Sequence, residues 1–97
     1  MHAKLKNVPK TWPKGASRNV TVAIDEGTPR VRCTVTLHRT TPAPERLLGS
    51  REVNLDDAGA LRVLFPVTLN VAGLTVLHCE VDCATDGDSD SKGTVVE

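Results

Sequence analysis

The chain has 97 residues, a formal net charge of zero, and one Trp and one Phe as its only large aromatic side chains. A chain of this length forms one domain. Nucleic acid is not an expected partner, because few aromatic residues could stack on bases and the charges balance overall. No apolar run is long enough for a membrane span or a signal peptide. A chain that begins at Met1 is therefore expected to stay in the cytoplasm unless it leaves with a larger particle.

Charge is unevenly distributed along the sequence. Residues 1–18 contain five basic residues and no acidic one, whereas residues 80–97 contain six acidic residues and one lysine. Such asymmetry indicates a charged partner or two ends that complement each other within an assembly. Two solvated tails are the alternative interpretation.

Residues 1–18 are predicted to form an extended N-terminal arm, because Pro9, Pro13 and Gly15 interrupt the segment. Trp12 is the one Trp of the chain and the one aromatic apolar side chain in this arm. A lone Trp in a polar arm either folds back onto its own core or anchors the arm in a neighbouring subunit, where Trp is common at interface hot spots. On the second alternative, the partner-binding residues are Lys4, Lys6, Lys10, Trp12 and Lys14.

Residues 19–97 are predicted to form a β-sandwich domain. Apolar and polar residues alternate in several short runs, which is typical of half-buried strands, and no run has helical spacing. Strands are expected over residues 19–25, 31–39, 46–55, 61–71, 74–83 and 94–97, with a polar, acidic loop at 84–93. About seven short strands separated by turn signals predict an all-β fold, an immunoglobulin-like antiparallel β-sandwich.

Two of these strands have a predicted place in the sheets. Residues 74–83 are expected to form the central strand, because Leu77, Cys79 and Val81 share one face and polar residues share the other. Pro66 has no N–H to donate, so the strand over residues 61–71 is predicted to lie at an edge or to bulge.

The second half of the chain carries turn and strand motifs in a recognisable order. They are Leu48-Gly49, Val53-Asn54-Leu55, Asp57-Ala58-Gly59, Val63-Leu64-Phe65, Gly73 and Val81-Asp82. This order resembles the bacterial immunoglobulin-like domains of the CARDB type, a cell-adhesion-related class whose members lie in secreted or surface proteins. The resemblance covers residues 46–97 and consists of core and turn positions, so it implies a fold more than a function. It departs from the class at Ser91-Lys92-Gly93, where an Asn pair is usual.

The three cysteines allow two interpretations. Cys33 and Cys79 are both predicted to point inward, where immunoglobulin domains join their two sheets, so a Cys33–Cys79 disulfide is possible. Free buried thiols are favoured over it, because the number of cysteines is odd and a cytoplasmic protein keeps its thiols reduced. His38 and His78 are predicted to face outward, so no zinc site is expected.

The acidic segment is a weak candidate for a calcium loop. Asp86, Asp88 and Asp90 alternate along the chain, and Asp82 could add a further carboxylate. The position that needs glycine in such a loop is occupied by Ser91, so a solvated acidic loop is favoured and no metal site is assigned.

No serine with a neighbouring His and acid, and no phosphate-binding glycine loop, is visible, so neither enzymatic activity nor a cofactor is expected. A single domain of this size is also similar to the small accessory proteins of tailed bacteriophages. We therefore expect a structural protein of the virion, a capsid decoration or appendage subunit assembled in the bacterial cytoplasm. Its expected partners are a major capsid or other virion protein and copies of itself, contacted by the arm and secondly by residues 40–46. The alternative is a cell-surface adhesion or carbohydrate-contacting module excised from a longer secreted protein.

Overall fold

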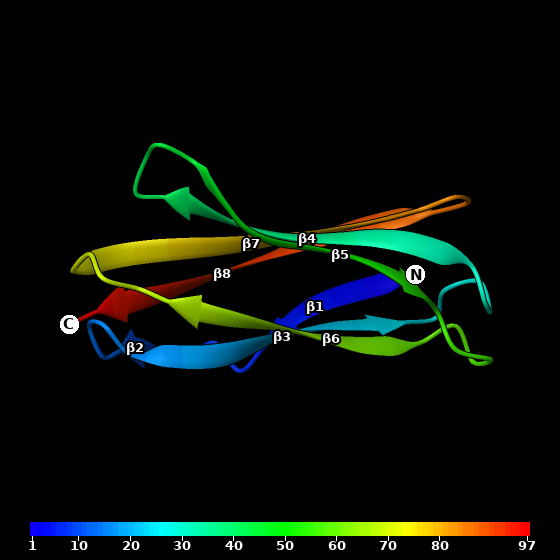
Figure 1. The fold of residues 1–97 in the computed structure, drawn as a ribbon, viewed down its shortest axis with the longest axis horizontal. Coiled ribbons are helices and arrows are strands. Elements are labelled where there is room, and N and C mark those ends of the chain that lie inside the picture. Colours follow the sequence, from blue (N-terminus) through cyan, green and yellow to red (C-terminus); the bar gives the residue numbers. More distant parts are fainter.

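The computed structural model describes residues 1–97 and contains two β-sheets packed face to face, with no helix (Figure 1). The three-stranded sheet has the order β1-β3-β6, with the bounds β1 (His2–Lys6), β3 (Ser17–Asp25) and β6 (Leu61–Thr68). The five-stranded sheet has the order β2-β8-β7-β4-β5, with the bounds β2 (Thr11–Trp12), β8 (Gly87–Val96), β7 (Gly73–Cys83), β4 (Arg32–Thr41) and β5 (Arg46–Asn54). All paired strands are antiparallel except β2 and β8.

This strand order is that of an immunoglobulin-like sandwich. The sheet that contains β3 and β6 faces the sheet that contains β4, β7 and β8, and β5 is added beside β4 as in the variable type. The N-terminal segment is divided between the sheets, with β1 in one and β2 in the other. The predicted all-β sandwich is therefore confirmed.

The hydrophobic core lies between the two sheets and follows from alternation along several strands, among them β4, β6 and β7. Leu77, Cys79 and Val81 of β7 are buried, and β7 lies between β8 and β4, so the predicted central strand is confirmed. From the opposite sheet, Val22 and Phe65 are also buried. The two inner faces together form one contiguous apolar cluster.

Strand β6 agrees with its prediction in position but not in length. It is an edge strand of the smaller sheet, and an edge strand tolerates the missing N–H of Pro66, whose side chain is exposed. The strand ends at Thr68, and Val71, which was expected to be its last residue, is 56% exposed in the following loop. Residues 69–72 connect β6 to β7, which begins at Gly73.

Residues 1–18 are extended, as expected, but they are part of the sandwich and do not form an arm outside it. Ala3 and Leu5 of β1 are buried in the core, and β1 pairs with β3 along its whole length. Strand β2 pairs with the end of β8. The alternation of small or apolar residues with lysine in this segment is thus a strand pattern, and the division into an arm and a domain is corrected to one domain.

The acidic segment is also different from the prediction. Residues 87–93 are not a loop but the first part of β8, which pairs with β7 from Gly87 to Val96. Strong pairing with β7 on one side offsets the low strand propensity of Asp, Gly and Ser in this segment. The acidic side chains are therefore held at defined positions on a strand.

Candidate functional site

The predicted partner-binding residues separate into two groups in the structure. The lysines at four of these positions are all exposed, namely Lys4, Lys6, Lys10 and Lys14. Trp12, in contrast, is fully buried, and its indole Nε1 donates a hydrogen bond of 2.9 Å to the carbonyl oxygen of Ala16. The assignment of Trp12 to a partner is corrected, because the side chain fills the protein's own core.

The four calcium candidates do not converge on one point. Asp82 is exposed on the outer face of β7, and Asp86 lies 3.1 Å from the α-amino group of Met1, whose hydrogen bond lowers the pKa of Asp86. Asp88 and Asp90 accept hydrogen bonds from backbone N–H groups of β1. No group of three or more His, Cys, Asp or Glu side chains is placed to hold a metal ion, and no helix is long and apolar enough to cross a membrane.

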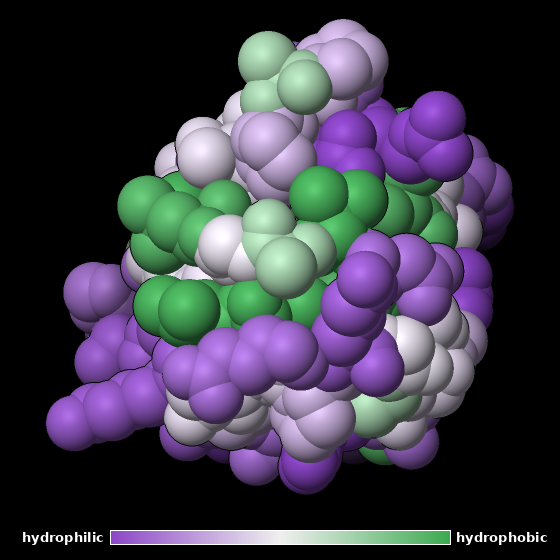
Figure 2. All heavy atoms as spheres, turned by 90° about the vertical axis from the view of Figure 1, so that its left-hand side faces the viewer, coloured by the Kyte–Doolittle hydropathy of each residue, from purple (hydrophilic) through white to green (hydrophobic).

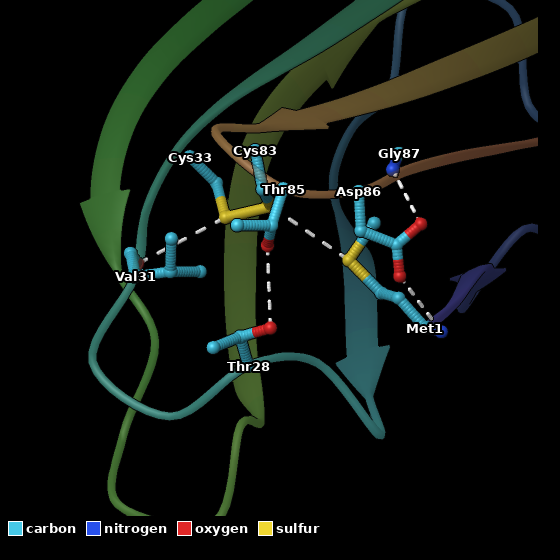
Figure 3. Close-up of a disulfide and its surroundings, with 8 residues drawn as sticks. All are labelled: Met1, Thr28, Val31, Cys33, Cys83, Thr85, Asp86 and Gly87. Carbon is cyan, nitrogen blue, oxygen red and sulfur yellow. Dashed lines mark hydrogen bonds and ion pairs between the residues drawn. A yellow bond between two sulfur atoms is a disulfide. The ribbon is translucent and has the colours of Figure 1, made fainter.

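The structure contains a disulfide between Cys33 and Cys83, near the end of the sandwich where β1 begins (Figure 3). The two residues face each other directly in the β4–β7 ladder, with a Cα–Cα distance of 4.1 Å. Cys79 lies opposite Leu37 on the same pair of strands and is too far along to reach Cys33. Both sequence-based interpretations, a Cys33–Cys79 bridge and three free thiols, are therefore corrected.

Cys79 remains as a free thiol inside the core. Burial is the main cause that raises the pKa of this thiol from 9.0 to about 11, and the nearby carboxylates of Asp90 and Asp88 contribute to this rise. A thiol in this state stays protonated near neutral pH, so it acts as an apolar core residue and not as a nucleophile.

The opposite end of the sandwich carries the most exposed apolar side chains. We call it the loop end, because the loops 42–45 and 69–72 and the C-terminus meet there (Figure 1). Figure 2 shows hydrophobic side chains gathered across the middle of this face, with hydrophilic ones around them. The exposed apolar residues near this end, which we call the end patch, are Leu47, Val71, Leu74 and Val95.

A cavity of about 260 Å³ opens within the loop end. Its apolar walls include Pro42, Leu48, Leu69 and Val71. Two arginines, Arg39 and Arg46, also line it, and no acidic residue does. The cavity is therefore a partly apolar hollow with an unbalanced positive charge.

The sequence positions Arg39 through two irregularities of β4. The ladder to β5 shifts register between Leu37 and His38, and the ladder to β7 shifts between Arg39 and Thr41. Such bulges redirect side chains next to them. Nη2 of Arg39 donates a hydrogen bond of 2.9 Å to the carbonyl oxygen of Pro44, whereas its buried Nε has no partner.

Arg39 and Arg46 lie opposite each other in the β4–β5 ladder, and neither forms an ion pair. Like charges directly opposite on neighbouring strands are unfavourable without an anion between them. Glu45 of the same loop contacts His38 instead, at 3.5 Å. The arrangement can bind an anion by charge-assisted hydrogen bonds.

The expected contact at residues 40–46 includes Arg46 but neither Arg39 nor the pairing of the two arginines. The signal was present, since positions that flank a hairpin loop pair across it, and arginines flank the loop at 39 and 46. A second hollow, beside the disulfide, is lined by Arg32 and Glu52, which pair with each other. Asp82 lines this hollow as well, so its lining has one more acidic than basic residue, unlike that of the loop end.

Comparison with known proteins identifies the fold only. No family model and no curated protein matches the sequence. A β-glucosidase from Listeria innocua, solved in complex with glucose, is similar over 98% of this chain with a TM-score of 0.67 and 17% identity, and the chain spans 16% of that enzyme's length. Macromomycin is similar over 99% of this chain and 98% of its own, with a TM-score of 0.62 and 14% identity.

Proposed function

We propose that the chain is a non-enzymatic binding subunit that attaches to a protein of a larger assembly through its loop end. The observation that carries this proposal is the exposure of two neighbouring apolar side chains, Val71 at 56% and Leu74 at 60%. Exposed apolar patches bounded by polar residues are characteristic of protein–protein contacts. Outside the end patch, Leu64 on the other sheet is the one exposed large apolar side chain, so the end patch is the one place where such side chains gather.

We propose further that the assembly is a virion and that the chain is a decoration or appendage subunit of the CARDB-like, immunoglobulin-like kind. A small rigid sandwich with its contact at one end suits attachment in many copies, where weak single contacts add up. The Cys33–Cys83 disulfide is compatible with the outer surface of a virion, which is an oxidising location. The expected partners are a capsid or other virion protein and sister copies.

A cell-surface adhesion or carbohydrate-contacting module is the second candidate. The same disulfide favours it, because such bonds are common in secreted and surface proteins. The similar part of the Listeria enzyme also makes up only 16% of a longer chain. On this alternative the chain would be one module of a longer exported protein.

Gradient-purified particles from cells that carry the gene in its natural surroundings test the first proposal. We expect the chain in the particle fraction, at a copy number measured by mass spectrometry. The double variant Val71→Asp/Leu74→Asp should be lost from the particles, because charge on the end patch opposes apolar contact. The matched control is Leu64→Asp, which adds charge at a residue 52% exposed on the other sheet and should leave attachment unchanged.

The outcomes separate the two candidates. Absence of the wild-type chain from particles, together with its recovery in the cell envelope or culture fluid within a longer protein, would support the surface module and reject the virion role. Attachment of the double variant Val71→Asp/Leu74→Asp at the wild-type level would reject the loop end as the contact surface.

A further inference from the structure

We propose that the cavity between Arg39 and Arg46 is an anion-binding site that receives an acidic side chain of the partner protein. This inference rests on the proposed function and specifies the chemistry of the contact. The site combines two guanidinium groups without acidic neighbours in the lining and apolar walls that continue outward into the end patch. A carboxylate presented among apolar residues matches both features.

Arg39 supplies the first argument. A buried polar N–H without a partner is costly, and each such group in a native protein calls for an explanation. Nε of Arg39 is such a group, although Nη2 of the same guanidinium is held by the carbonyl oxygen of Pro44. The contact with Pro44 therefore holds one donor of the guanidinium, and Nε is a buried donor without a partner.

The pairing of Arg39 with Arg46 supplies the second argument. Two cross-strand arginines repel each other, and a carboxylate between them would receive hydrogen bonds from both. The planar fork of a guanidinium matches the two oxygens of a carboxylate. Pro42, Leu48 and Val71 line the same cavity, so the methylene stem of an acidic side chain would lie against apolar atoms.

The extent of the apolar surface supplies the third argument and identifies the occupant as a protein. Leu47 and Leu74 are exposed at the loop end but do not line the cavity, so the apolar surface extends beyond the cavity itself. A small free carboxylic acid would leave these side chains in water. A partner surface with a protruding Asp or Glu and apolar neighbours would cover them.

The chemistry of the cavity is tested by NMR titration of the ¹⁵N-labelled chain with hexanoate, with hexanamide as the neutral probe of the same shape. We expect hexanoate to shift the Arg39 side-chain Nε–H resonance and the Asn70 and Val71 amides in a saturable way, and hexanamide to bind several-fold more weakly. Arg39→Gln should weaken hexanoate binding about tenfold, the loss expected for one charge-assisted hydrogen bond. Equal binding of the two probes, or unchanged binding to Arg39→Gln, would overturn the inference.

Two further variants keep the test decisive. Arg46 is exposed, so Arg46→Gln should fold normally and still weaken hexanoate binding several-fold, and it decides the matter if Arg39→Gln fails to fold. The matched control Arg18→Gln removes an exposed arginine that makes no ion pair, and it should bind hexanoate like the wild type. Equal weakening by Arg18→Gln and Arg46→Gln would reduce the effect to net charge and overturn the site.

Particle attachment distinguishes this inference from the proposed function. Arg39→Gln and Arg46→Gln should both be lost from particles, although Val71 and Leu74 are unchanged in them. Wild-type attachment of these variants would reject a partner carboxylate in the cavity while the attachment role itself stands, and hexanoate binding would then mark a small-molecule site. A chain that binds hexanoate but is absent from all particles would reject the proposed function alone.

Discussion

The backbone N–H of Ala3 donates a hydrogen bond of 2.7 Å to Oδ2 of Asp88. The same relationship is repeated two residues further along each strand, where the N–H of Leu5 donates to Oδ2 of Asp90 at 2.8 Å. Strand β1 is paired with β3 on its other edge, so the two carboxylates take the place of a neighbouring backbone. They connect the N-terminal strand of one sheet to β8 of the other and close that side of the sandwich.

The first prediction concerns the pH dependence of this connection. The hydrogen bond from Ala3 is the main cause that lowers the pKa of Asp88 below its ordinary value of 3.8. A lowered pKa in the folded state stabilises the protein above the unfolded-state pKa, and this stabilisation is lost as the pH falls through the folded-state value. We therefore expect the free energy of unfolding in urea to decrease as the pH falls below about 4.

Asp88→Asn tests this explanation. It keeps an acceptor but no charge, so it should cost about 1 kcal/mol at neutral pH and show a weaker loss of stability in acid. The matched control is Asp82→Asn, which changes an exposed carboxylate on the outer face of β7 and should keep the wild-type pH profile. Identical flattening of the profile in both variants would contradict a specific role of Asp88.

The second prediction concerns the disulfide. Cys33 and Cys83 are 50 residues apart in sequence, and closing a loop of this length stabilises a protein by about 4 kcal/mol in the chain-entropy account. Cys33→Ala/Cys83→Ala should lower the free energy of unfolding by up to this amount. Alkylation of the oxidised protein should modify one cysteine, and only after unfolding, because Cys79 is buried. Three alkylated cysteines without a reductant would contradict the bridge.

The sequence predicted the sandwich because its strands are half-buried and alternate. That signal is clear in β7, where every second residue faces the core, and in β6, where Pro66 marks an edge. It failed in the segment 87–93, because Asp, Ser and Gly have low strand propensity and only pairing with β7 makes the segment a strand. The pattern of apolar and polar residues predicts a strand where one face of the strand is buried. It does not predict a strand that forms only because a neighbouring strand pairs with it.

The candidate site was less predictable than the fold. The lysines were assigned from charge density along the chain, yet Trp12 lies in the core because β2 adds to the edge of β8. The correct cysteine pair depends on the register of β4 against β7, which periodicity does not specify. Arg39 and Arg46 form a site only because a hairpin brings them together beside the 69–72 loop.

The third prediction concerns Trp12, which is fully buried and is the only Trp of the chain. Trp12→Ala should lower the free energy of unfolding by about 3–5 kcal/mol, because it leaves a large cavity in the core. In the wild type, Trp fluorescence should shift to the red on unfolding. An emission maximum typical of water-exposed Trp in the native state, or an unchanged free energy of unfolding in Trp12→Ala, would contradict the burial of Trp12. It would restore this residue as a candidate for partner contact.

The fourth prediction compares two glycines with positive φ. Gly59 has φ of +71°, and a Cβ there would overlap the carbonyl oxygen of Gly27, whose N–H donates to the carbonyl oxygen of Gly59 at 2.8 Å. Gly73 has φ of +115° and open space around it. Gly73→Ala should therefore cost only backbone strain, about 1–3 kcal/mol, and Gly59→Ala clearly more. Thermal unfolding of both variants measures the difference. Equal losses of stability would show that the close approach of Gly27 does not add to the cost of Gly59→Ala.

The last prediction concerns the four exposed lysines, which remain candidates for partner contact. Lys14 lies beside the C-terminal residue, since its N–H donates to the carbonyl oxygen of Glu97 at 2.6 Å, whereas Lys4 and Lys6 project from β1. Changing Lys4, Lys6, Lys10 and Lys14 together to Gln should leave the fold intact, because all four side chains are exposed. Charges at the rim of a contact accelerate association more than they slow dissociation, and salt screens them.

If the proposed virion role is correct, the quadruple variant should bind more slowly to particles stripped of the chain, with a weaker dependence on salt and an unchanged dissociation rate. The wild type at high salt is the matched comparison and should approach the association rate of the variant. Faster dissociation of the variant would instead place the lysines inside the contact. An unchanged association rate at low salt would exclude them from partner recognition and leave the loop end as the sole contact surface.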